Sequence, residues 1–199
     1  MPATALIHIS GPAEILFFAV YAAWLLGESI GATIVPRLRY GARKGERRDR
    51  GSFYINVVTL VLAIYVDFVL SGRRISLLPV WAYYLGITFM LVGLVLRQWA
   101  VAVLGRFFTL TVKVQSDHAI VETGPYKLMR HPSYTGLLLT LIGIALALQT
   151  WIGLLINVSV FAAVFGYRIY VEERALISAL GEKYISYSKR TKRLIPYIF

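Results

Sequence analysis

Five stretches of apolar residues constrain the fold of this chain more than any other feature. They cover residues 13–35, 53–70, 80–104, 134–148 and 151–171. A helix needs about 20 residues to cross the hydrocarbon core of a bilayer, so each stretch is long enough, or nearly long enough, to span it. Of the 199 residues, 58% are hydrophobic, which is more than a soluble domain of this length usually carries. We therefore predict an all-α integral membrane protein with five transmembrane helices in a single domain, residues 1–199.

The basic residues predict how this bundle lies in the membrane. The formal net charge is +11, which on its own would also fit a nucleic-acid-binding protein. The Lys and Arg residues outside the spans, however, alternate along the chain. Seven fall in the first loop, two in the second, four in the central loop, none in the fourth and six from Arg174 onward. Because cytoplasmic loops carry the excess of Lys and Arg, we expect the N-terminus outside, the C-terminus in the cytoplasm, and membrane lipid rather than nucleic acid as a partner.

Glu28, Asp67 and Arg97 are charged residues that lie inside the apolar stretches. Glu28 is expected to face another helix or the membrane interface. Asp67 lies near the end of its helix, where Arg73 and Arg74 are expected to pair with it. Arg97 either extends to the cytoplasmic interface or points into a polar pocket, and the sequence leaves both alternatives open.

The last two apolar stretches are separated only by Gln149 and Thr150. So short a link predicts a hairpin of two antiparallel helices. Gly136 and Gly143 are seven residues apart, on one face of the first arm. Small residues at this spacing predict a close approach to a neighbouring helix.

The predicted topology brings a central loop, residues 105–133, and a tail, residues 172–199, to the same membrane face. Candidate site residues gather there: His118, Tyr126, His131, Tyr134, Arg168 and Glu172. Arg168 and Glu172, at i and i+4 on one helix, also fit a purely structural ion pair. His131-Pro132 also fits a plain turn. The chain has no cysteine and no HxxxH or HxH spacing, so we predict no metal site.

These residues belong to an ordered series of short motifs. Through the central loop run Gly105-Arg106-x-Phe108-Thr109, His118-x-x-Val121, Gly124-x-Tyr126 and Arg130-His131-Pro132-Ser133-Tyr134-x-Gly136. Arg168-x3-Glu172-Glu173 and Gly181-x-x-Tyr184-x-x-Tyr187 follow. In this order and at this spacing the series resembles the isoprenylcysteine carboxyl methyltransferase family, over roughly residues 80–199.

The resemblance implies S-adenosylmethionine as the cofactor, S-adenosylhomocysteine as its product, and no metal. The cofactor would lie in a pocket of helices and loops, because the sequence has no Gly-rich Rossmann fingerprint. The resemblance implies that the following residues line it: Gln115, His118, Ala119, Ile120, Val121, Tyr126, His131, Pro132, Ser133, Tyr134 and Glu172. Arg168 and Glu172 form the expected catalytic pair. Arg168 would bind the carboxylate of the acceptor with its planar guanidinium, and Glu172 would hold Arg168, border the positive end of the cofactor, or do both.

The expected activity is methylation of the carboxylate of a lipophilic, prenylcysteine-like acceptor at the membrane surface. The five expected spans are fewer than the eight of the longer animal members of the family, which leaves the surface for a protein substrate undefined. Two alternatives therefore remain open. One is a phospholipid or small isoprenoid-lipid methyltransferase, and the other is a non-catalytic membrane lipid-binding protein.

Overall fold

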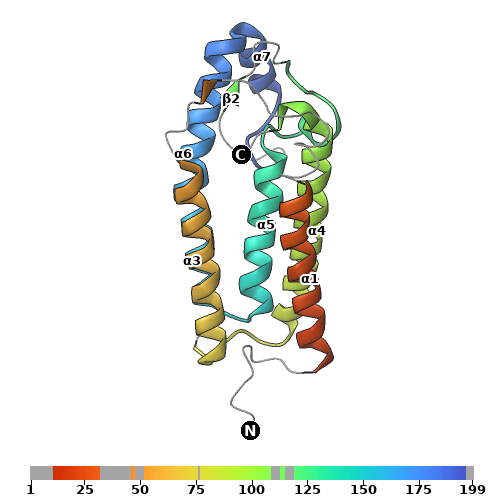
Figure 1. Ribbon diagram of the computed structural model, residues 1–199, viewed down its shortest axis with the longest axis vertical. Helices are drawn as coiled ribbons and strands as arrows, with labels where there is room; N and C mark the ends of the chain where they lie inside the picture. Colours follow the sequence, from red (N-terminus) through yellow and green to blue (C-terminus); the bar gives the residue numbers. More distant parts are fainter. Residues whose placement is uncertain are drawn as a thin grey trace.

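The chain forms an elongated bundle of helices that run along one axis, with a polar cap at one end (Figure 1). The computed structural model describes residues 11–31, 46–47, 52–75, 77–108, 113–114 and 119–195. Its α-helices are α1 (Pro12–Ser29), α3 (Ser52–Gly72), α4 (Trp81–Leu104), α5 (Pro132–Ala147), α6 (Trp151–Leu180) and α7 (Glu182–Arg190). Helix α1 packs on α4, α3 packs on α6, and α5 lies between α4 and α6.

Each of the five predicted apolar stretches coincides with a helix. The expected span within α6 ends at residue 171, and the helix continues beyond it, through the first residues of the expected tail, to Leu180. A helix of 30 residues is about 45 Å long, more than the hydrocarbon core of a bilayer, so its last turns extend into the polar cap. Gly181, with a φ of 56°, ends the helix and turns the chain into α7.

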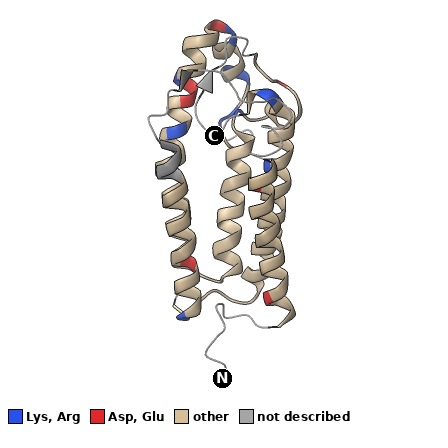
Figure 2. Cartoon of the chain, in the orientation of Figure 1, with Lys and Arg blue, Asp and Glu red and all other residues tan. Residues whose placement is uncertain are grey.

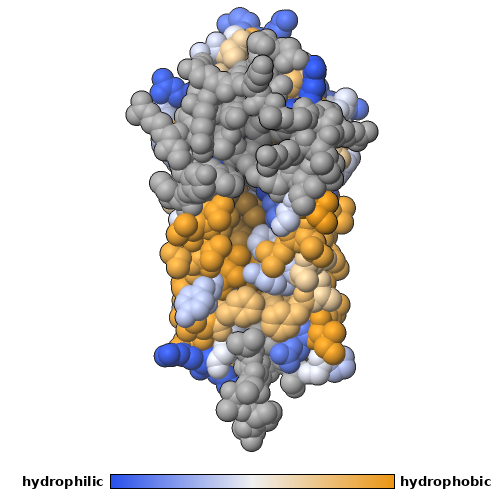
Figure 3. All heavy atoms as spheres, viewed as in Figure 1, coloured by the Kyte–Doolittle hydropathy of each residue, from blue (hydrophilic) through white to orange (hydrophobic). Residues whose placement is uncertain are grey.

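On the face seen in Figure 3, apolar side chains form a belt along the long part of the bundle. Lys and Arg residues instead lie mainly at the two ends (Figure 2). Many large apolar side chains in the belt face outward, among them Val95 and Leu155, which are 66% and 57% exposed. Among the described residues, Trp81–Phe107 and Trp151–Leu180 are long and apolar enough to cross a membrane, while Val57–Gly72 and Pro132–Ala147 are shorter apolar helices. This pattern is the one expected where the solvent around the bundle is lipid.

Helices α4 and α5 approach so closely that glycines form their interface. A Cβ on Gly136 would lie 2.7 Å from the carbonyl oxygen of Gly93, and one on Gly143 would lie 2.7 Å from that of Gly86. The predicted close approach at Gly136 and Gly143 is therefore confirmed, with two glycines of α4 as the opposite face. Helices α5 and α6 form the predicted hairpin, whose turn includes Gln149 with a φ of 59°.

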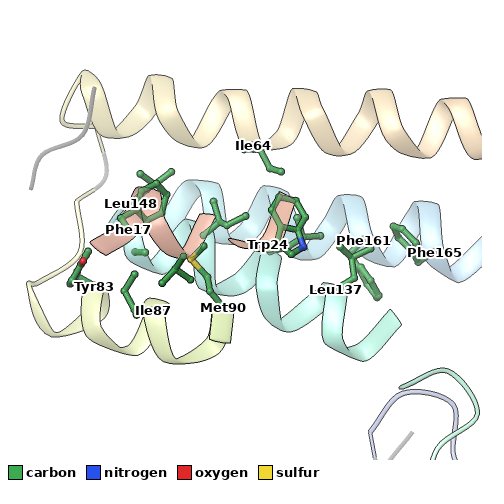
Figure 4. Packing of buried hydrophobic residues seen from close by; sticks show 14 residues of the cluster. Phe17, Trp24, Ile64, Tyr83, Ile87, Met90, Leu137, Leu148, Phe161 and Phe165 are labelled. Atoms are coloured by element: carbon green, nitrogen blue, oxygen red, sulfur yellow. The ribbon is translucent and has the colours of Figure 1, made fainter. Parts of the chain in front are cut away.

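The interior of the bundle is apolar and rich in aromatic rings. Phe17 of α1, Met90 of α4 and Leu141 of α5 are fully buried in one cluster. Phe161 and Phe165 of α6 extend the cluster toward the polar cap (Figure 4). Tight packing here fixes α6 relative to α5, which determines where the charged residues at the end of α6 lie.

Arg97 points into the protein. Its Nε and Nη2 atoms donate to the carboxylate of Glu28, the second at 2.6 Å, and its Nη1 donates to Oγ and the carbonyl oxygen of Ser133 at 2.8 and 3.1 Å. Of the two alternatives, the inward position is the one observed. Glu28 faces another helix, as expected, because a buried guanidinium requires a charged partner.

The expected pairing of Asp67 with Arg73 or Arg74 is wrong. Asp67 is fully buried and accepts a hydrogen bond of 2.8 Å from Nδ2 of Asn157 on α6. Arg73 and Arg74 follow the last residue of α3 and are exposed. The chain turns away from the helix face that carries Asp67 before either arginine can reach it.

The described parts of the central loop lie in the polar cap, beside α7 and the end of α6 (Figure 1). Strand β2 (Lys113–Val114) pairs antiparallel with β1 (Glu46–Arg47) of the first loop, so the two loops lie side by side. Two 3₁₀ turns, η2 (Gly105–Phe107) and η3 (Gly124–Lys127), are the other regular segments described in this loop.

Candidate functional site

The candidate site lies where the first turn of α5, the cap-side half of α6, the turn η3 and the chain after α7 come together. Pro132 begins α5, and the residues just before and after it carry the two aromatic side chains His131 and Tyr134. Arg168 and Glu172 lie one turn apart on α6. Segments more than 30 residues apart in the sequence thus meet at the boundary between the apolar belt and the cap.

Tyr134 connects Arg168 to Glu172. Nε of Arg168 donates a hydrogen bond of 2.8 Å to the hydroxyl of Tyr134. The hydroxyl in turn donates one of 2.7 Å to Oε2 of Glu172. Arg168 is only 5% exposed, so this chain of hydrogen bonds holds a guanidinium and a carboxylate in fixed positions near lipid. The expected link between Arg168 and Glu172 therefore passes through a tyrosine.

Aromatic rings line the approach to this charged group. The ring of His131 stacks on that of Tyr134, with centroids 5.5 Å apart. On the other side Tyr134 contacts Phe165 at 5.3 Å, and Phe165 stacks on Phe161 at 4.8 Å. Such a row of rings provides an apolar wall that runs from the bundle interior to Arg168 and also attracts positive charge to the ring faces.

Glu173 joins the site to the C-terminal segment. Its Oε1 accepts hydrogen bonds from Nε of Arg130 at 2.8 Å and contacts Nε2 of His131 at 3.4 Å. Its Oε2 accepts one from Nε of Arg193 at 3.1 Å. With 8% exposure, Glu173 is a buried carboxylate shared by three side chains that surround the candidate site.

The chain after α7 lies against the loop that precedes α5. The backbone N–H groups of Arg130 and His131 donate to the carbonyl oxygens of Lys192 and Arg193, at 2.7 and 3.0 Å. Nη1 of Arg130 also donates to the carbonyl oxygen of Thr191. The tail thus holds the His131 backbone in place by a short parallel pairing.

Tyr126 forms part of the same packed region. It is 5% exposed, and its carbonyl oxygen accepts a hydrogen bond of 2.8 Å from the hydroxyl of Tyr187. Burial raises the pKa of Tyr126 well above its usual value of 10.0. Burial likewise raises the pKa of Tyr187, to about 12. Both phenols are therefore neutral at physiological pH, and Tyr187 acts as the packing element that its position in α7 suggests.

The remaining residues that were predicted to line the cofactor pocket differ in how deeply they are buried. Pro132 and Ser133 are buried, and the hydroxyl of Ser133 is bound to Arg97. Ile120 and Val121 are half-buried and Ala119 is exposed, on the segment that leads into η3. Gln115 and His118 lie outside the described residues, as does Thr109 of the first motif.

Sequence reasoning missed the roles of three residues in the site. It placed Tyr134 only in the cofactor lining, and it assigned no role to Arg130 or Glu173. The sequence does contain a signal for these roles. Two adjacent acidic residues lie on α6, and an arginine comes immediately before the His-Pro turn. Adjacent helix residues point about 100° apart, so Glu172 and Glu173 must contact different partners.

Known proteins resemble this chain in both sequence and fold. Residues 85–178 match the isoprenylcysteine carboxyl methyltransferase (ICMT) family. Protein-S-isoprenylcysteine O-methyltransferase B of Arabidopsis thaliana is 32% identical over 120 residues, which are 59% of this chain and 61% of that protein. The Saccharomyces cerevisiae protein-S-isoprenylcysteine O-methyltransferase is 37% identical over 116 residues, or 57% of this chain and 48% of that protein. This chain therefore aligns with about half to three-fifths of the length of these relatives.

The fold extends the likeness to nearly the whole chain. The structure of a eukaryotic intramembrane Ras methyltransferase, ICMT, superposes with a TM-score of 0.68 at 23% identity, over 96% of this chain and 70% of that one. The helices that precede residue 85 thus have counterparts in an integral membrane fold. Just under half of the chain, residues 85–178, thus matches the isoprenylcysteine carboxyl methyltransferase family, and the similarity in fold extends over nearly the whole chain.

Proposed function

We propose that this protein transfers a methyl group from S-adenosylmethionine to the carboxylate of a lipophilic, prenylcysteine-like acceptor at the membrane surface. One observation carries the proposal: the hydrogen-bonded series Arg168–Tyr134–Glu172 lies at the end of an aromatic wall, where the apolar belt meets the polar cap. A lipid tail and a charged head group need this combination of surroundings. The family relationship supplies the reaction type.

The residues around Tyr134 suit S-adenosylmethionine. The cofactor carries a positive sulfonium, which aromatic faces and a nearby carboxylate stabilise. Tyr134, His131 and Glu172 provide both within one cluster. When bound, the cofactor supplies an electrophilic methyl group. Tyr126 and the segment 119–121 would border it on the cap side, with Gln115 and His118 as further proposed lining residues.

Arg168 is the proposed binding residue for the acceptor carboxylate. A free α-carboxylate has a pKa near 3.5, so it is ionised at neutral pH and no general base is required. The rate then depends on holding a carboxylate oxygen in line with the methyl carbon and keeping water away. The hydrogen bond from Nε to Tyr134 fixes the guanidinium plane, and the planar edge formed by the terminal nitrogens matches a carboxylate.

Glu172 is a positioning residue in this proposal. It accepts the hydroxyl hydrogen of Tyr134, which orients the lone pair that receives Nε–H of Arg168. Its negative charge also compensates the guanidinium in a region of low dielectric. The pair thus remains charged beside lipid, where the proposed acceptor would present its carboxylate.

We also propose that the chain crosses the membrane five times, with this site on the cytoplasmic face. The apolar belt and the alternation of basic residues support it. In that arrangement both the water-soluble cofactor and a membrane-anchored acceptor reach the cap end of the bundle.

Acceptor profiling of the purified protein tests the proposed function. Labelled S-adenosylmethionine is supplied with a farnesylcysteine analogue, with the carboxamide of that analogue, or with phosphatidylethanolamine vesicles. We expect transfer to the free acid alone, and a product that releases its label in base as a methyl ester does. Base-stable transfer to the amine lipid would instead assign a phospholipid methyltransferase. Absence of S-adenosylhomocysteine binding in calorimetry would leave a lipid-binding protein.

A further inference from the structure

A second polar cluster lies inside the bundle at the end opposite the candidate site. Asp67 and Ser71 are one turn apart on α3, Thr150 precedes α6, and Asn157 lies on α6. All four side chains are at most 1% exposed. A carboxylate inside an apolar bundle is costly unless its charge is compensated, so its retention calls for a specific partner.

Several oxygen atoms of this cluster have no hydrogen-bond partner among the described residues. They are Oδ1 of Asp67, Oγ of Ser71, Oγ1 of Thr150 and Oδ1 of Asn157. The orientation of the Asn157 amide is fixed, because Nδ2 donates to Oδ2 of Asp67 at 2.8 Å and to the carbonyl oxygen of Leu141 at 2.9 Å. Its oxygen is therefore an acceptor that cannot be exchanged for a donor by a flip.

Gly153 brings two of these oxygens together. A Cβ on Gly153 would lie 2.0 Å from Oδ1 of Asp67 and 2.3 Å from Oγ1 of Thr150. Both oxygens thus approach the same point on α6, which only a residue without a side chain leaves accessible. Oδ1 of Asp67 and Oγ1 of Thr150 consequently lie close to one buried point beside Gly153. Ser71 lies one turn from Asp67 on α3, and Asn157 lies one turn from Gly153 on α6.

From this arrangement we infer that Asp67, Thr150 and Asn157, together with Ser71, bind a single small monovalent cation of the Na⁺ type. Hard cations prefer carboxylate, carbonyl and hydroxyl oxygens, which is the full set of ligands here. One carboxylate balances one positive charge, whereas calcium sites commonly use several carboxylates. A proton on Asp67 would satisfy one oxygen, but a cation is ligated by several oxygens at once.

The bound cation would tie α3 to the α5–α6 hairpin. Helix α3 packs mainly on α6, and Asp67 with Asn157 is a buried polar contact between them. Anything that binds the folded state alone stabilises it in proportion to the logarithm of its concentration. The protein should therefore be more stable in sodium salts than in salts of a large organic cation.

Thermal unfolding in detergent tests this inference with Na⁺ itself as the probe. We expect a saturable rise in Tm with NaCl that choline chloride at the same ionic strength does not reproduce, and saturable binding of radioactive sodium. Asp67→Asn, which keeps the shape and removes the charge, should abolish both effects. Glu14→Gln, at the same end of the bundle, should leave them unchanged.

A milder substitution tests the same inference if Asp67→Asn fails to fold. Thr150→Val preserves side-chain shape and removes one proposed ligand, so Na⁺ should bind at least about tenfold more weakly. Equal Tm values in sodium and choline salts would overturn the inference and assign the cluster to ordered water or a protonated Asp67. An unchanged sodium response in Thr150→Val or in Asp67→Asn would overturn it as well.

Discussion

At the scale of single residues, the hydroxyl of Tyr134 is the atom on which the candidate site depends. It accepts from Arg168 and donates to Glu172, so removing it breaks both hydrogen bonds at once. The ring itself is held independently between His131 and Phe165. The two contributions of Tyr134, packing and orientation, can therefore be separated by one substitution.

Tyr134→Phe should keep the fold and lower kcat for methyl transfer by roughly 10- to 100-fold, because Arg168 loses its orienting partner. The matched control is Tyr167→Phe, one residue before Arg168, whose side chain is 63% exposed. Steady-state kinetics with the farnesylcysteine analogue provide the measurement. Equal kcat values for the two variants would remove Tyr134 from the proposed mechanism.

The charged residues within the helices show which features of single residues the sequence predicts and which it does not. The sequence indicates that Glu28, Asp67 and Arg97 need partners, because ionised groups are costly in lipid. It does not indicate which partner, because Glu28 and Arg97 are 69 residues apart and Asp67 and Asn157 are 90 apart. Such pairs are determined by the rotation of each helix about its axis, which depends on packing against all its neighbours.

At the scale of elements, the contact between α4 and α5 is the most demanding packing in the bundle. Gly136→Ala would place a Cβ 2.7 Å from the carbonyl oxygen of Gly93 and 2.8 Å from the backbone N of Arg97. We expect a loss of about 1–3 kcal/mol in stability, since neither backbone can move without disturbing the other helix.

Gly166→Ala is the matched control for that substitution, because nothing lies within 4 Å of the added Cβ. It should be neutral, or stabilising by up to about 1 kcal/mol through helix propensity. Thermal unfolding of both variants in the same detergent gives the comparison. Equal Tm values would show that α4 and α5 do not meet as described.

The segment after α7 should depend on Glu173. Glu173→Gln weakens the charge-assisted hydrogen bonds from Arg130 and Arg193. We expect faster amide hydrogen exchange in residues 128–131 and 191–195, which pair with each other, and weaker S-adenosylhomocysteine binding through the displaced His131. Glu182→Gln, exposed at the start of α7, should change neither. Unaltered exchange in Glu173→Gln would mean that the backbone pairing alone holds the tail.

At the scale of the whole molecule, length and apolarity predicted where the long helices of the bundle lie in the sequence. Each of the five apolar stretches lies on a helix, because the helical backbone satisfies its own hydrogen bonds in lipid, whereas the polar helix α7 has no such stretch. Helix α6 continues past the expected span to Leu180, through residues 172–180, which are too polar to belong to the apolar stretch. Glu173 and Ala175 of this segment are buried, so it packs within the cap, a contact that the apolar pattern does not contain.

The proposed orientation can be measured directly because the chain has no cysteine. Single cysteines introduced near residues 5, 45, 75, 120 and 195 should react with an impermeant maleimide from outside intact cells only near 5 and 75. This follows from the excess of Lys and Arg in the first loop, the central loop and the tail. Labelling near residue 45 from outside would contradict the proposed orientation.

The central claim is that Arg168 binds the acceptor carboxylate, and the most direct measurement is methyl transfer beside cofactor affinity in Arg168→Lys and Arg168→Ala. Lysine keeps the charge but loses the planar, two-point contact, so it should not rescue the alanine variant. We expect kcat/KM for the farnesylcysteine analogue to fall by about 10²-fold or more in both variants, with S-adenosylhomocysteine affinity largely retained. Near-normal turnover in Arg168→Ala would contradict the account and leave the Arg168–Tyr134–Glu172 series as a purely structural link.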